Sequence, residues 1–93
     1  MLFRKKLKVS NKHGLHARPA SKIVNIVNKF KANLFLTRLD GDGKRADCKS
    51  VLQILLLGAN KDTELELIAE GVEASEAIEE VSSYFNRNFD EVV

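Results

Sequence analysis

The sequence is poor in cysteine and lacks long apolar runs, and each shortage excludes a class of protein. Cys48 is the single cysteine among 93 residues, which excludes an internal disulfide framework and suits a reducing compartment. The longest apolar run, residues 54–57, is far too short to span a bilayer, and no apolar signal-peptide stretch follows the basic N-terminal residues. We therefore expect a soluble cytoplasmic protein without a membrane partner, with residues 1–93 forming a single domain.

Acidic residues are absent from residues 1–31, whereas residues 62–93 are rich in Glu and Asp. The net charge of the whole chain is only +2, which is too balanced to indicate nucleic acid as a partner. A basic N-terminal third would suit an acidic partner, although a solvated strand and helix face explains it equally well.

Apolar periodicity predicts both strands and helices. Alternation of apolar and polar residues indicates strands with one buried face, although Lys5 interrupts the apolar face of the first one. The turn signal Asp40-Gly41-Asp42-Gly43 predicts a hairpin, and apolar residues three and four apart predict amphipathic helices. The predicted strands cover residues 2–9, 33–39, 44–48 and 63–70. The predicted helices cover residues 17–29, 50–58 and 74–87, followed by a tail over 86–93 that Phe89 anchors.

This order of elements predicts the fold class. We expect an α+β protein built as an open-faced β-α-β-β-α-β-α sandwich, because one face of each strand is apolar and the other polar. In it a four-stranded antiparallel sheet is covered on one face by three helices.

The segment from Gly14 to Ala20 places His16 at a helix entrance. Pro19 fits only the first turn of a helix, so His16 should lie at or beside the N-cap, where free N–H groups and the positive end of the helix dipole attract phosphate. The same surroundings disfavour a protonated imidazole and leave a neutral nitrogen as a nucleophile, while Arg18 offers a cationic fork for phosphate oxygens. A plain surface or capping histidine is the competing interpretation.

Ser50 marks a second candidate site. With Gln53 three residues later it forms a capping-box pattern that opens an apolar helix. That helix is apolar nearly all round, so part of it should stay exposed as a docking patch, with Val51, Leu52 and Leu55 as its candidate residues. A phosphate on Ser50 would add about two negative charges beside this patch and repel an acidic partner. A purely structural cap is the simpler interpretation.

Other catalytic or ligand-binding constellations are not indicated. His13 and His16 lack a third ligand at metal-site spacing, so we expect His13 to be a turn residue near the site, and no metal or cofactor. Cys48 has no partner motif and is expected in the core. No pair of carboxylates is placed by the sequence to act as acid and base around His16.

Two motifs resemble one known family. The segment Asn11-Lys12-His13-Gly14-Leu15-His16-Ala17-Arg18-Pro19-Ala20 resembles the phosphohistidine signature of HPr, the histidine-containing phosphocarrier of the bacterial phosphoenolpyruvate phosphotransferase system. Lys49-Ser50-Val51 resembles the regulatory serine site of the family, and residues 63–71 fit its last strand. The resemblance covers nearly the whole chain, and the order of elements predicted above is also that of the family.

The resemblance implies a function and partners. His16 would accept a phosphoryl group on Nδ1 from phosphorylated Enzyme I and pass it to an enzyme II A domain of sugar transport, steered by Arg18, so that the protein is a carrier and not an enzyme. Ser50 would be the target of a serine kinase and a phosphorylase in organisms that have them. A monomer without nucleic acid is expected. The residues assigned to partner docking are Leu15, Pro19, Ala20, Val51, Leu52 and Leu55.

Two departures keep other functions open. The apolar run after Ser50 is less rich in methionine than in many members of the family. This difference changes the surface that a serine kinase would have to recognise. The ending from Tyr84 to Glu91 is similar to that of the nitrogen-related branch, so a regulator of nitrogen or carbon use without a role in sugar transport is an alternative. An RNA-binding module is a more remote alternative. It needs aromatic residues on adjacent strands, and only Phe35 is near such a position.

Overall fold

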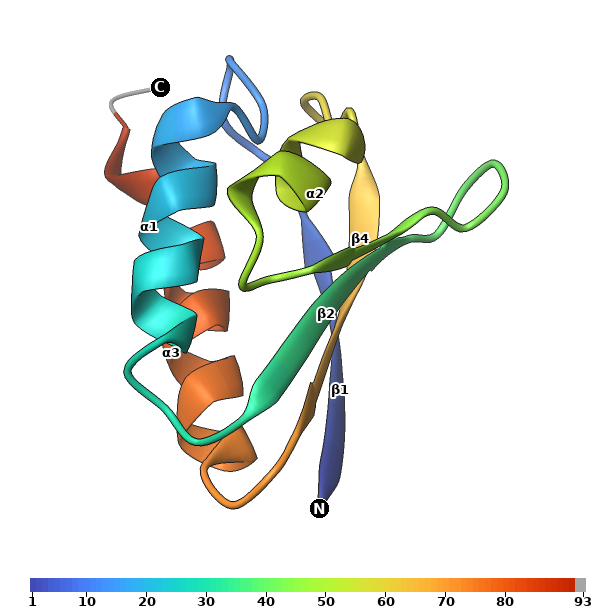
Figure 1. Ribbon diagram of the computed structural model, residues 1–93. Helices are drawn as coiled ribbons and strands as arrows, with labels where there is room; N and C mark the ends of the chain where they lie inside the picture. The colour runs from blue at the N-terminus through green and yellow to red at the C-terminus, as the bar shows by residue number, and fades with distance from the viewer. Residues whose placement is uncertain (92–93) are drawn as a thin grey trace.

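The computed structural model describes residues 1–91, so that Val92 and Val93, the end of the predicted tail, lie outside the described residues. Strands and helices follow one another in the predicted order (Figure 1). The strands are β1 (Leu2–Lys8), β2 (Asn33–Arg38), β3 (Arg45–Asp47) and β4 (Glu64–Glu70). The helices are α1 (Ala17–Val27), α2 (Val51–Leu56), α3 (Ala74–Asn86) and the short 3-10 turn η1 (Asn88–Asp90).

The sheet is antiparallel throughout, with the strand order β1-β4-β2-β3. Strand β4 is therefore central, and its residues alternate as predicted: Leu65, Leu67 and Ala69 are fully buried, whereas Glu64 and Glu70 are exposed. All three helices lie on the side of the sheet to which these apolar residues point (Figure 1). The predicted open-faced α+β sandwich is confirmed.

Lys5 of β1 shares a face with Leu7, which is buried, and its place on that face has a physical reason. The Lys5 Nζ atom lies 3.2 Å from Glu79 Oε1 of α3, and the Lys5 side chain is partly buried whereas that of Glu79 is largely exposed. The long apolar stem of a lysine covers core atoms while its charged head reaches water. Lys5 thus sits where α3 crosses the margin of the sheet.

The helices bury the stripes that their periodicity predicts. On α1 the buried residues are Pro19, Ala20, Ile23, Ile26 and Val27. This helix ends two residues earlier than predicted, because the N–H groups of Lys29 and Phe30 bind carbonyls three residues back and tighten the last turn.

Cys48 is fully buried, as expected, and burial raises the pKa of its thiol. Within residues 1–91 none of the helices has the length and apolar composition that a membrane span requires.

Gly14 fixes the approach to α1. It adopts a positive φ of 71°, and the next residue, Leu15, donates its backbone N–H to Ala59 O at 2.9 Å. A Cβ atom at position 14 would lie 2.8 Å from Ala59 O, which is too close for any side chain. Gly41, in the β2–β3 turn, has a similar φ of 59° but open space around it. A comparison of the two positions therefore distinguishes the cost of a left-handed backbone from the cost of a steric clash.

Replacing Gly14 by alanine should destabilise the protein more than replacing Gly41. Gly41→Ala should lower the free energy of unfolding by about 1–2 kcal/mol, the cost of a left-handed non-glycine residue. Gly14→Ala should lower it by about 3 kcal/mol, because a clash with backbone adds about 1–3 kcal/mol. Urea denaturation of both variants measures the difference, and equal losses would show that the contact with Ala59 does not matter.

Candidate functional site

His16 is the N-cap residue of α1, as predicted. Its backbone is extended, with φ −90° and ψ −170°, and its carbonyl accepts the first intrahelical hydrogen bond, from the N–H of Ala20 at 3.0 Å. Its side chain makes no capping hydrogen bond and is 34% exposed. The N–H groups of Ala17 and Arg18 begin the helix, where no carbonyl one turn earlier can bind them. The imidazole therefore stands beside unpaired donors at the positive end of the helix.

Glu91 contacts the imidazole, which the sequence did not indicate. Glu91 Oε2 lies 2.6 Å from His16 Nε2, and Glu91 Oε1 accepts a hydrogen bond from Asn11 Nδ2 at 2.9 Å. These hydrogen bonds, from Asn11 first and from His16 second, hold the pKa of the Glu91 carboxyl below its usual value. The sequence placed no pair of carboxylates around His16 to act as acid and base, but the fold brings two carboxylates, Glu91 and Asp90, to its groove.

The C-terminal turn, residues 88–91, brings Glu91 to this place. Phe89 is buried between Tyr84 and Phe85, with ring centroids 5.2 and 4.8 Å away, which confirms that Phe89 anchors the tail. Asn88, Phe89 and Asp90 all have positive φ, so the chain turns back on α3. Figure 1 shows the end of the described chain beside the start of α1.

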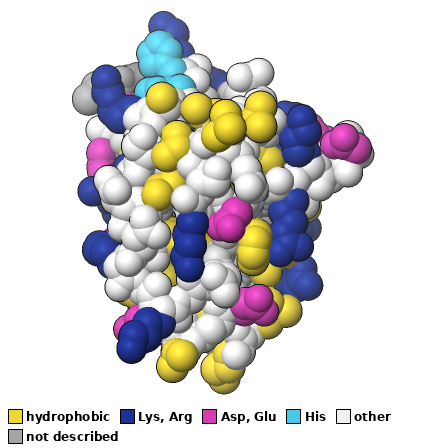
Figure 2. All heavy atoms as spheres, viewed as in Figure 1, with side chains coloured by type: hydrophobic (Ala, Val, Ile, Leu, Met, Phe, Trp, Pro, Cys, Tyr) yellow, Lys and Arg dark blue, Asp and Glu magenta, His cyan; other side chains and the backbone are white. Residues whose placement is uncertain are grey.

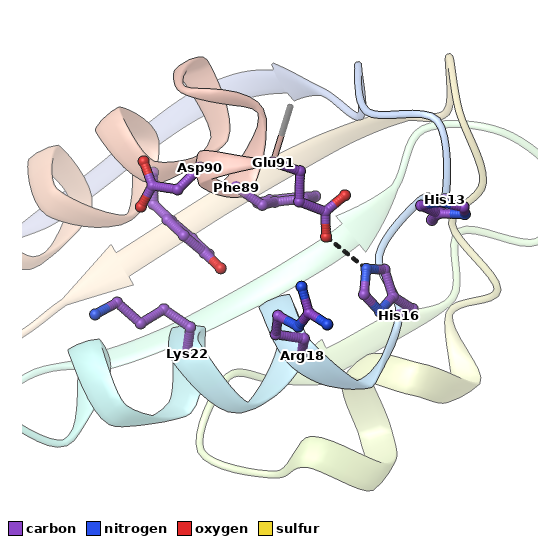
Figure 3. A pocket seen from close by; sticks show the side chains of 8 residues that line it. His13, His16, Arg18, Lys22, Phe89, Asp90 and Glu91 are labelled. Atoms are coloured by element: carbon purple, nitrogen blue, oxygen red, sulfur yellow. Dashed lines mark hydrogen bonds and ion pairs between the residues drawn. The ribbon is translucent and has the colours of Figure 1, made fainter. Parts of the chain in front are cut away.

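These residues surround one open groove between α1 and the C-terminal turn, with a volume of about 640 Å³. Figure 3 shows the Arg18 side chain rising from α1 toward the groove, with Lys22 one turn further along the helix. His13 is a neighbour too, its ring edge-on to that of His16 at a centroid distance of 6.0 Å. The groove thus places a histidine and two cations on one wall, facing two carboxylates on the other. Residues 1–91 contain no cluster of His, Cys, Asp and Glu that could hold a metal ion.

Ser50 lies outside this groove, at the start of α2. Its Oγ accepts a hydrogen bond from the Gln53 N–H at 3.2 Å, so that half of the predicted capping box forms. The other half does not, because Gln53 Oε1 accepts a hydrogen bond from the Asp47 N–H at 2.9 Å and not from Ser50. Ser50 is thereby the side-chain cap of a helix of only six residues.

Helix α2 exposes a leucine patch, which we define as Leu52, Leu55 and Leu56. Their exposed fractions are 65%, 37% and 59%, while Ile54 and Leu57 of the same turn region are buried. Figure 2 shows hydrophobic side chains gathered at the end of the molecule where α2 lies, beside the histidines. Val51 is only partly buried and packs against the core. Leu56 was not among the predicted docking residues.

Three other residues that we predicted to contact a partner are buried, so their assignment to partner docking is wrong. Leu15 and Ala20 are buried in the core, and Pro19 is fully buried on the inner side of α1. Adjacency to His16 in the sequence suggested a surface, but the helical period turns positions 19 and 20 toward the sheet. These side chains hold the start of α1 in place and offer no surface to a partner.

A family model described as "PTS HPr component phosphorylation site" matches residues 3–87. The phosphocarrier protein NPr of Escherichia coli K12 is 34% identical over 91 residues, which cover 98% of this chain and 99% of NPr. Multiphosphoryl transfer protein of Escherichia coli O157:H7 is 38% identical over 73 residues, 78% of this chain. The matched part is 19% of that relative, so the chain spans about a fifth of its length.

Solved structures agree with the fold. A crystal structure of HPr from Thermoanaerobacter tengcongensis gives a TM-score of 0.88 at 31% identity, covering 98% of this chain and 99% of that one. The crystal structure of Crh, the catabolite repression protein of Bacillus subtilis, gives a TM-score of 0.70 at 36% identity, covering 90% and 93%. Crh in that crystal is an intertwined dimer with a swapped domain.

Removing the hydroxyl of Ser50 should weaken α2. Ser50→Ala deprives the Gln53 N–H of its acceptor, and we expect a loss of about 1 kcal/mol in the free energy of unfolding. Ser50→Asp keeps a capping oxygen and should lose less. Urea denaturation of both variants tests this, and an unchanged stability of Ser50→Ala would mean that water replaces the cap at no cost.

Proposed function

The chain belongs to the HPr family of phosphocarrier proteins, and on that premise we propose that His16 is the residue that carries the phosphoryl group. One observation carries the proposal: the half-exposed His16 ring stands at the N-terminus of α1 with Nε2 held by Glu91, which leaves Nδ1 as its free nitrogen. A phosphoryl group joined to Nδ1 through a covalent N–P bond would then lie beside the first helical N–H groups. Residues 1–93 act as one carrier domain in this proposal.

The surroundings of His16 suit a phosphoryl group that stays only for a time. The free N–H groups and the dipole of α1 attract the phosphoryl oxygens, and Arg18 adds a charged fork within reach of the same groove. The groove is open, so the group stays accessible to the next protein. Transfer of a phosphoryl group depends mainly on alignment and on neutralising its charge, which these residues supply.

The partners follow from the same proposal. Phosphorylated Enzyme I would be the donor, and an enzyme II A domain of sugar transport would be the acceptor. Both would approach the leucine patch, because an apolar surface beside a basic site suits proteins that bind in turn through small, transient interfaces. The match to part of a multiphosphoryl transfer protein supports a place in a series of phosphoryl transfers. The monomer expected from the sequence stays a prediction beside the dimer of Crh.

Incubation with phosphoenolpyruvate and Enzyme I should add one acid-labile phosphate to the protein. Intact-mass spectrometry should show the gain in the wild type and its loss in His16→Ala. His13→Ala is the matched control, because it removes the neighbouring ring and leaves His16, and it should still be phosphorylated. A wild-type protein that gains no phosphate would contradict the carrier function.

A regulatory protein without a role in sugar transport is the second candidate. The observation that favours it is the C-terminal turn, because the ending that resembles the nitrogen-related branch is the segment that packs against the site. Similarity to Crh, the catabolite repression protein of Bacillus subtilis, supports a regulatory role. In such a protein Ser50 would take a phosphate without unfolding α2, since its hydroxyl lies at the surface of the helix start and the leucine patch follows it.

Phosphorylation at Ser50 is tested with ATP and an HPr serine kinase. We expect one acid-stable phosphate in the wild type and none in Ser50→Ala, because phosphoserine, unlike phosphohistidine, survives acid. Ser10→Ala removes another exposed serine and serves as the control. Equal labelling of Ser50→Ala and the wild type would refute the assignment of this serine.

A further inference from the structure

We propose that Glu91 is a positioning residue for phosphoryl transfer at His16, holding the imidazole in the tautomer whose lone pair is on Nδ1. The proposal rests on the proposed role of His16 and adds to it the group that selects the reacting nitrogen. In this role Glu91 acts through the ring, to which it is bound at 2.6 Å, and not on the phosphoryl group itself.

The identity of the two atoms in this contact determines where the ring proton lies. A carboxylate has no proton to donate and can only accept a hydrogen bond. Because Glu91 Oε2 faces His16 Nε2, that nitrogen must be the donor, and in the neutral ring the lone pair then falls on Nδ1. The nitrogen that the family resemblance names as the phosphoryl acceptor is thus the nitrogen that this contact leaves nucleophilic.

Asn11 fixes the orientation of the carboxylate. Its Nδ2 atom donates to Glu91 Oε1 at 2.9 Å and to Gly14 O at 2.8 Å, and Asn11 itself is fully buried. Each oxygen of Glu91 therefore has its own donor, Asn11 for one and His16 for the other. Since Asn11 and Gly14 belong to the turn that leads into His16, the carboxylate and the ring are held by the same piece of backbone.

The C-terminal turn holds Glu91 from the other side. Phe89 is buried against Tyr84 and Phe85, and Arg87 Nε donates to Asp90 Oδ1 at 2.7 Å. The Glu91 side chain is only 12% exposed, so its charge is less screened by water than a surface carboxylate would be. Figure 3 shows the carboxylate pointing from this turn directly at the ring of His16.

The contact also suits the charge that transfer creates. The Nδ1 lone pair forms the N–P bond as the bond between phosphorus and the donor breaks, and the electron pair of that bond leaves with the donor. The proton stays on Nε2, so the ring gains a positive charge that Glu91 neutralises at a distance already set. The other charged and titratable groups that face the groove are His13, Arg18, Lys22 and Asp90, together with the Tyr84 hydroxyl.

The tautomer is measured directly by long-range ¹H–¹⁵N NMR of the unphosphorylated protein, at a pH where the ring is neutral. In the wild type, Nε2 of His16 should give the shift of a protonated nitrogen and Nδ1 that of a bare one. In Glu91→Gln the side chain is neutral and can also donate, so the population with the proton on Nδ1 should rise by about fivefold or more. Glu79→Gln removes a carboxylate from an exposed position of α3 outside the groove and should leave both shifts unchanged.

The rate of phosphorylation by Enzyme I and phosphoenolpyruvate should fall about fivefold to tenfold in Glu91→Gln, because a charge-assisted hydrogen bond is replaced by a neutral one. Glu79→Gln should stay close to the wild-type rate. Wild-type shifts in Glu91→Gln, or equal changes in Glu79→Gln, would overturn the proposal. The NMR measurement needs no phosphoryl donor, so a failure of His16 to be phosphorylated at all would refute the carrier function separately.

Discussion

The hydrogen bond from the Leu15 N–H to Ala59 O is the constraint on which the site depends. It joins the turn before α1 to the loop before β4, and it forms only because Gly14 brings the backbone so close to Ala59. With the Leu15 side chain buried and its N–H engaged, the next residue has to leave the core. His16 therefore lies at the surface, next to buried residues, at the first turn of a helix whose buried side chains fix its position.

What the sequence predicted well depends on neighbours along the chain. The alternation in β4, the period of α1 and the place of Pro19 in its first turn are local patterns, so the strands, the helices and the N-cap position of His16 could be read directly. The burial of Ala20 follows from the helical period of α1, although its closeness to His16 led us to assign it to partner docking. Glu91 was not predictable in this way, since 75 residues separate it from His16 and only the packing of Phe89 brings it there.

The groove balances its charges in a way that suits a carrier. Arg18 and Lys22 come from α1, whereas Asp90 and Glu91 come from the C-terminal turn, so the cations and the carboxylates belong to separate pieces of chain. A wall of cations alone would bind a phosphoryl dianion firmly and slow its departure. Carboxylates on the facing wall moderate that attraction, and Glu91 does so while bound to the ring itself.

The left-handed backbone of Phe89 has a consequence for which sequences can build this groove. A positive φ disfavours every residue except glycine, and Asn and Asp, which tolerate it best, stand at positions 88 and 90. At position 89 the backbone would favour glycine and the aromatic pocket favours phenylalanine. The pocket prevails, because burying a phenylalanine stabilises by about 1.5–3 kcal/mol, against about 1–2 kcal/mol for the left-handed conformation. Variation at this position is therefore governed by the fit of a ring against Tyr84 and Phe85, the reverse of the rule that holds at most left-handed turns.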